Sequence, residues 1–123
     1  MVGQWTKRLI PDTEKWIECK YRQMDYYLTQ VLTGHGRFQN YAHKMGKAPN
    51  SKCRYCPEED SAEHTIFYCI RWKDPRTEMN NKLGLLLTPE NLIPTMLGSI
   101  SAWKEVKALS ETILRTKEKE DRA

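Results

Sequence analysis

Four residues of types that bind metal ions fall within one short stretch of the sequence. They are Cys53, Cys56, His64 and Cys69, in the pattern C-x2-C-x7-H-x4-C. Two cysteines three positions apart can turn both sulfur atoms inward on a tight turn, and the histidine and last cysteine can complete a tetrahedron. Three thiolates and one imidazole favour zinc, because harder ions prefer oxygen ligands. The pattern predicts one structural Zn²⁺; the alternative is three buried apolar cysteines beside an unrelated histidine.

The sequence around this predicted site contains no recognisable catalytic set. Four protein ligands would leave a zinc ion coordinatively closed, which argues against hydrolysis at the metal. The acidic residues of the first half are scattered, and those between Cys56 and Cys69 are expected to be solvated. Cys19 has no matched histidine and base, so we expect a buried thiol rather than a nucleophile. We therefore predict no catalytic residues.

Basic and aromatic side chains surround the predicted metal site. Small zinc knuckles bind nucleic acid through Lys and Arg contacts to phosphates and by stacking unpaired bases on aromatic rings. The candidate nucleic-acid contacts are Lys47, Lys52, Arg54, Tyr55, Arg71 and Lys73. Among these, Tyr55 is the best candidate for stacking, whereas Phe67 and Trp72 are expected in the core.

The distribution of charge agrees with a polyanionic partner. The 123 residues carry a net charge of +4, but residues 1–56 hold ten Lys/Arg against four Asp/Glu, and residues 57–123 hold ten against twelve. A basic first half suits RNA or DNA. Charge alone does not decide the point, because many soluble domains are equally basic and bind no polyanion.

The metal stretch must be positioned by the elements on either side of it. Apolar residues at helical spacing predict one helix within residues 22–33, ending at Gly34, and a second over 38–45; the two are expected to form a helical hairpin. Within the metal stretch, Thr65 to Tyr68 could pair as a short strand with the Cys53 arm.

The second half of the sequence predicts three more helices. One runs from Trp72 to Gly84, and a second follows Thr88-Pro89-Glu90, where a capping residue, a proline and an acid mark a helix start. The last follows one apolar face from Ile100 to Ile113. Beyond Thr116 we expect a solvated, fraying tail.

Together these elements predict a mainly α protein, a small helical domain built around a Cys-Cys-His-Cys zinc knuckle with a short β-hairpin. The expected parts are a helical N-terminal segment at 1–46, the zinc knuckle at 47–72, and C-terminal helices with a charged tail at 73–123, in one domain overall. With 29% charged residues the core is thin, so a bound metal would matter to stability. No apolar run resembles a signal peptide or a membrane span, so we expect an intracellular protein, nuclear or cytoplasmic, with no membrane partner.

Residues on both sides of the metal stretch match a known family. They are Trp5-Thr6, Leu9-Ile10-Pro11, Trp16, Tyr27-Leu28-Thr29-Gln30, Gly34-His35-Gly36, Phe38, Tyr41, Glu63-His64 with the three cysteines, Trp72, Arg76, Thr88-Pro89-Glu90-Asn91, Met96-Leu97 and Trp103. In these positions the sequence resembles the C-terminal region of the Pol polyprotein of non-LTR retrotransposons, particularly type-1 elements that insert into arthropod ribosomal DNA.

The resemblance implies that this chain follows a reverse-transcriptase domain in a polyprotein with RNA-directed DNA polymerase and endonuclease activities. It also implies that the metal site helps to hold template RNA or target DNA during target-primed reverse transcription. The seven residues before His64 form a longer gap than in retroviral nucleocapsid knuckles, so their mode of reading bases is not carried over. The paired catalytic aspartates of the polymerase have no counterpart here.

Two functions are therefore expected, in order. The first is nucleic-acid binding through the basic first half of the chain. The second is a zinc-stabilised interaction module that packs on the reverse-transcriptase domain of the same polyprotein and has no direct nucleic-acid contact. A self-contained nuclease ranks last.

Overall fold

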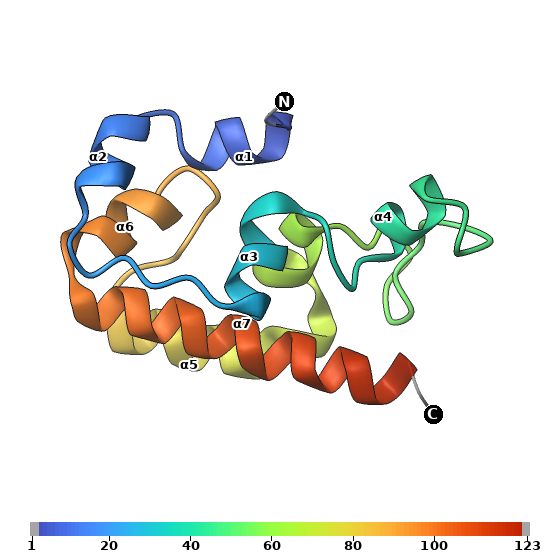
Figure 1. Ribbon diagram of the computed structural model, residues 1–123. Helices are drawn as coiled ribbons and strands as arrows, with labels where there is room; N and C mark the ends of the chain where they lie inside the picture. The colour runs from blue at the N-terminus through green and yellow to red at the C-terminus, as the bar shows by residue number, and fades with distance from the viewer. Residues whose placement is uncertain (1–2, 122–123) are drawn as a thin grey trace.

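The computed structural model describes residues 3–121, and helices joined by loops make up the fold (Figure 1). In chain order the elements are α1 (Gln4–Leu9), α2 (Thr13–Glu18), α3 (Tyr26–Thr33), α4 (Gln39–Lys44), the π-helix η1 (His64–Tyr68), the 3-10 helix η2 (Ile70–Trp72), α5 (Lys73–Leu83), α6 (Leu92–Gly98) and α7 (Ile100–Asp121). This agrees with the prediction of a mainly α protein. Within the described residues, no helix combines the length and the apolar character that crossing a bilayer requires.

The longest helix, α7, packs against three of the other helices. Its buried side chains recur at three- and four-residue spacing, which places them on one face. They include Trp103, Val106, Ile113 and Leu114, each no more than 1% exposed. This face contacts α3, α5 and α6, and Figure 1 shows α7 running along the length of the molecule. The predicted apolar stripe therefore forms the centre of the core.

Local capping signals set both ends of α3. The sequence predicted a helix within residues 22–33 that ends at Gly34, but not the N-cap at Asp25. The Asp25 carboxylate accepts a hydrogen bond of 2.7 Å from the backbone N–H of Leu28, so α3 starts with a satisfied N-cap. Gly34 follows the last turn with φ of +72°, a left-handed conformation that favours glycine, and its N–H bonds back to Gln30. A side chain of α1 also anchors that helix to α3, because Trp5 Nε1 donates to the backbone carbonyl of Val31 at 2.8 Å.

The predicted β-hairpin is wrong. No strand occurs within residues 3–121, and Thr65–Tyr68, the expected second arm, belongs to η1. The Cys53 arm forms only an isolated antiparallel bridge, between Lys52 and Glu59. β-branched and aromatic residues suggested a strand, but burial of the four successive side chains from His64 to Phe67 on a π-helical turn overrides that local preference.

The C-terminal segment also differs from its prediction. Beyond Thr116 the chain is not a solvated tail, because α7 continues to Asp121. Lys117 Nζ lies 2.9 and 3.0 Å from the two carboxylate oxygens of Asp60. Only 11% and 7% of these two side chains are exposed. Asp60, which was expected to be solvated, thus ties the end of α7 to the metal stretch.

Two more hydrogen bonds complete the environment of Asp60. Its carboxylate oxygens accept from Thr65 Oγ1 at 2.8 Å and from the backbone N–H of Gln39, the first residue of α4, at 3.0 Å. One buried carboxylate therefore joins α4, η1 and α7.

Candidate metal centre

The four predicted ligands converge in the folded chain. The ligand atoms of Cys53, Cys56, His64 and Cys69 all lie within 4.8 Å of one another. The Cys69 sulfur is 3.8 Å from each of the other two sulfurs, far beyond the roughly 2.05 Å of a disulfide bond. Bonds of about 2.3 Å from zinc to sulfur in a regular tetrahedron place two sulfurs about 3.8 Å apart. The observed spacing is therefore that of ligands around one tetrahedral metal ion.

The first two cysteines are placed by a short closed loop. The backbone N–H of Cys53 donates to the Glu58 carbonyl at 2.9 Å, and that of Asp60 donates to Ser51 at 2.9 Å, which closes the loop at its base. Inside it, the N–H of Tyr55 points to the Cys53 sulfur at 3.5 Å. The loop thus positions the sulfurs of both cysteines.

The π-helix η1 positions the other two ligands. His64 is its first residue and Cys69 follows its last, and the Cys69 N–H donates to the His64 carbonyl at 2.6 Å. In an α-helix, residues five apart point roughly 140° away from each other. The wider π-turn, with its hydrogen bonds between residues five apart, reduces this angle. This explains why the segment between the ligands is a π-helix.

The histidine side chain provides an independent test of whether a metal fits. His64 is 7% exposed, and its Nε2 atom is buried with no hydrogen-bond partner among the described residues. Leaving a buried polar atom unpaired costs about 1–3 kcal/mol. Coordination to a cation would satisfy this nitrogen at the place where the three sulfurs converge. The donor set and the unpaired nitrogen therefore both fit a metal ion.

The protonation state of the cluster depends on whether a cation is bound. Burial, with the neighbouring sulfurs of Cys53 and Cys56 adding to it, raises the pKa of the Cys69 thiol to about 12. At neutral pH that thiol therefore stays protonated unless a positive charge lies next to it. A bound divalent ion supplies this charge and deprotonates a coordinating thiol. With four protein ligands the ion would have no open position, so the centre suits a structural role.

Arg76 on α5 supports the backbone that carries two of the ligands, a role that its position in the sequence did not suggest. Its guanidinium donates to the carbonyls of Ile66 (2.7 Å), Cys69 (2.8 Å) and Thr65 (3.2 Å). Burial lowers the pKa of Arg76, whereas the nearby charges of Cys69 and Cys56 raise it. Arginine remains charged despite such a shift, so it also offsets the negative charge of the thiolates.

Replacing Arg76 with glutamine is expected to lower the free energy of unfolding of the zinc-loaded chain by about 3 kcal/mol, because three charge-assisted hydrogen bonds are lost. Arg76→Lys keeps the charge but not the forked donors. The free energy of unfolding of this variant should therefore lie between those of the wild type and the glutamine variant. Urea titration followed by circular dichroism measures the effect. Equal stability of Arg76→Gln and wild type would contradict this role.

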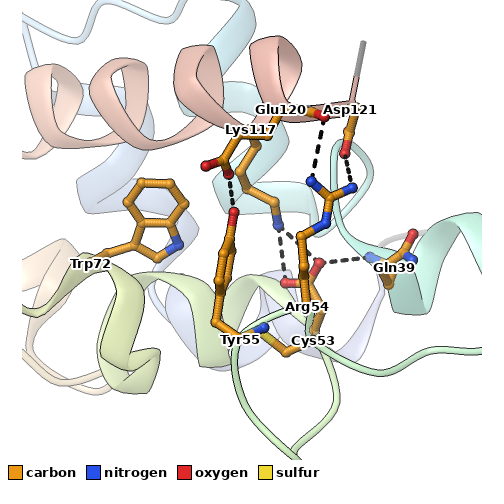
Figure 2. Close-up of a pocket in the computed structure, with 9 residues that line it drawn as sticks. Gln39, Cys53, Arg54, Tyr55, Trp72, Lys117, Glu120 and Asp121 are labelled. Atoms are coloured by element: carbon orange, nitrogen blue, oxygen red, sulfur yellow. Dashed lines mark hydrogen bonds and ion pairs between the residues drawn. The ribbon is translucent and has the colours of Figure 1, made fainter. Parts of the chain in front are cut away.

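The predicted nucleic-acid contacts fall into two groups. The first group consists of three exposed lysines: Lys47 lies in the loop after α4, Lys52 lies beside the closed loop, and Lys73 begins α5. The second group, Arg54, Tyr55 and Arg71, contacts the end of α7. Figure 2 shows Arg54 and Tyr55 directed toward Glu120 and Asp121. Phe67 and Trp72 are buried, as predicted, at 8% and 4% exposure.

The end of α7 interacts with this second group through its carboxylates. Tyr55 Oη donates a hydrogen bond to Glu120, and Arg71 Nη2 lies 3.3 Å from the same carboxylate. The bond from Tyr55 and the contact with Arg71 lower the pKa of Glu120. Glu120 is therefore a carboxylate at neutral pH. The sequence could not have indicated these partners, which are 49 and 65 positions away from Glu120.

Comparison with known proteins supports the family resemblance. No protein-family model matches the chain, and no solved structure gives a significant match. The chain is 30% identical over 90 residues to a protein of Nasonia vitripennis, the retrovirus-related Pol polyprotein from type-1 retrotransposable element R1 4. The aligned part is 72% of this chain and 23% of that protein, so the chain spans less than a quarter of the curated relative it matches. The chain is thus related to a region of a non-LTR retrotransposon Pol polyprotein, as its motifs predicted.

Proposed function

We propose that this chain is the C-terminal region of a non-LTR retrotransposon Pol polyprotein, that it binds one structural zinc ion, and that it binds RNA or DNA beside that ion. The observation that carries the proposal is the convergence of the ligand atoms of Cys53, Cys56, His64 and Cys69 within 4.8 Å of one another, with the buried Nε2 of His64 lacking a hydrogen-bond partner among the described residues. In the parent polyprotein the region would help to hold template RNA or target DNA during target-primed reverse transcription.

Basic side chains on either side of the metal centre support the nucleic-acid part of the proposal. Lys52 and Arg54 flank the first ligand, and Arg71 and Lys73 follow the last one. All four are exposed. The charges of Lys52 and Lys73 are accessible to phosphates, whereas Arg54 and Arg71 lie against Asp121 and Glu120. The guanidinium of Arg71 also lies 5.6 Å from the centroid of the ring of Tyr55, which is exposed. Basic groups beside aromatic rings are the combination that single-stranded nucleic acids bind.

Charge reversal at two exposed lysines tests this proposal. Lys52→Glu with Lys73→Glu is expected to weaken binding of a labelled single-stranded RNA about tenfold at moderate salt, because two phosphate contacts become repulsive. The slope of log affinity against log salt should also become shallower. Fluorescence anisotropy with RNA and with duplex DNA measures both.

The matched control reverses two other exposed lysines, Lys15 on α2 and Lys104 on α7. It changes the net charge equally, and α2 lies at the opposite end of the molecule from the metal stretch in Figure 1. Equal affinities for the two double variants would contradict a nucleic-acid surface beside the metal centre. Thermal melting of both variants verifies that folding is unchanged.

A second function, packing on the reverse-transcriptase domain of the same polyprotein, is favoured by one specific observation. Two large apolar side chains on either side of Cys69 are exposed, Tyr68 at 61% and Ile70 at 67%. In this function zinc fixes the fold and the apolar pair contacts the neighbouring domain. Tyr68→Ser with Ile70→Ser should then weaken capture by that domain without changing the affinity for RNA.

A further inference from the structure

The last turn of α7 places two carboxylates among three arginines that come from separate parts of the chain. Asp121 lies 3.4 Å from Arg37 and 3.5 Å from Arg54. Glu120 lies 3.3 Å from Arg71. Arg37 precedes α4, Arg54 stands inside the metal loop and Arg71 is in η2, so the three guanidiniums converge only in the folded chain.

Glu120 and Asp121 also close the space beside Arg54. The cavity lined by Cys53, Arg54, Tyr55, Trp72 and the end of α7 retains a volume of only about 40 Å³. That is room for water and not for a nucleotide. Figure 2 shows Tyr55, Arg54 and the last residues of α7 facing one another across this space. While α7 is docked, the cavity beside Arg54 and Tyr55 therefore has no room for a nucleotide, and the guanidiniums of Arg37, Arg54 and Arg71 are paired with carboxylates.

Helix stability does not explain acidic residues at this position. Carboxylates at a helix C-terminus oppose the helix dipole, which favours cations there. Yet the last turn of α7 carries Glu118, Glu120 and Asp121, with Lys119 as its only basic residue. The arginines on the other side of the contact account for the two carboxylates that face them.

We propose that Arg37, Arg54 and Arg71 form a binding site for successive phosphates of RNA or DNA, and that Glu120 and Asp121 occupy this site in the free chain as substitutes for phosphate. Nucleic acid then binds by displacing the last turn of α7. This inference rests on the proposed function, because it names the phosphate site and the contact that regulates it.

The ion pairs of Glu120 and Asp121 with the three arginines have the properties of contacts that nucleic acid can displace. Their side chains are 28–56% exposed, and exposed ion pairs are individually weak and screened by salt. Guanidinium groups also pair with phosphate in a bidentate geometry. One turn earlier, the nearly buried pair of Lys117 with Asp60 holds α7 in place. Only the last turn must therefore unwind, and the rest of the fold is kept.

The test compares two double variants of the zinc-loaded 1–123 chain with the same change in net charge. Glu120→Gln with Asp121→Asn removes the two carboxylates that occupy the proposed phosphate site. Glu78→Gln with Glu111→Gln removes two exposed carboxylates that pair with Lys82 and Arg115 on their own helices. Affinity for a short fluorescein-labelled oligouridine is measured by anisotropy. If the last turn of α7 occupies the site in about nine-tenths of the free chains, only about one-tenth of them can bind RNA directly. We therefore expect roughly tenfold tighter binding for the first variant than for the second.

A second readout measures the mobility of the last turn of α7 directly in the wild-type chain. The ¹⁵N heteronuclear NOE of the Glu120 and Asp121 amides should be high in the free chain and fall when oligouridine is added, while that of Lys117 stays high. If RNA binds with equal affinity to both double variants and the NOE values stay high, the inference is overturned and the proposed function stands. If the wild type and both variants fail to bind RNA at low salt, the result contradicts both the proposed nucleic-acid binding and this inference.

Discussion

Replacing Cys69 with serine is expected to abolish stable zinc binding and to unfold the chain around η1. Cys69 is 1% exposed, and its sulfur is 3.8 Å from both other sulfurs, so no other side chain replaces it as a ligand. Structural zinc contributes about 10–16 kcal/mol of binding free energy in small zinc peptides, against a typical domain stability of about 5–15 kcal/mol. We expect the variant to lose at least about 5 kcal/mol of stability relative to the zinc-loaded wild type.

Zinc content by atomic absorption and thermal melting by circular dichroism measure this effect. Cys19→Ser is the matched control, because Cys19 is a half-buried thiol outside the cluster. It should retain one zinc per chain and melt near the wild-type temperature. A Cys69→Ser protein that binds zinc and melts like the control would show that the cluster is a group of buried thiols and not a metal centre.

The second large effect is expected at Asp60. Asp60→Ala leaves the Lys117 ammonium buried without its counter-ion, and removes the acceptor for Thr65 Oγ1 and the Gln39 N–H. Removing one member of a buried pair typically costs about 3–5 kcal/mol. We expect a loss of that size in the free energy of unfolding, measured by urea denaturation.

A double-mutant cycle separates the ion pair from the loss of the other hydrogen bonds. Lys117→Met added to Asp60→Ala removes the unpaired charge, so the double variant should be more stable than Asp60→Ala alone. Glu111→Ala breaks an exposed pair with Arg115 and should change stability by less than about 0.5 kcal/mol. Additive effects of the two core substitutions would show that Asp60 and Lys117 do not interact.

The ligand set could be predicted from the sequence because metal binding restricts both residue type and spacing. Cys53, Cys56, His64 and Cys69 lie within 17 consecutive positions, so their proximity required no knowledge of the tertiary fold. The helices were predictable for a similar reason. Apolar periodicity in α7, and the caps of α3 at Asp25 and Gly34, are local signals.

The errors arise where distant residues determine the local structure. The Thr65–Tyr68 run has strand-forming side chains, yet the geometry between His64 and Cys69 and the hydrogen bonds from Arg76 produce a π-helix. Asp60 was placed with the solvated acids because its partner, Lys117, is 57 positions away. The charged run after Thr116 resembled a fraying tail for the same reason.

The coordination of zinc in the loaded chain tests the central claim of this account most directly. X-ray absorption spectroscopy at the zinc edge resolves the number and type of ligand atoms. We expect one zinc per chain, bound by three sulfurs at about 2.3 Å and one nitrogen at about 2.0–2.1 Å, with no oxygen ligand. A spectrum dominated by oxygen or nitrogen ligands, or a chain that binds no zinc, would contradict a centre formed by Cys53, Cys56, His64 and Cys69.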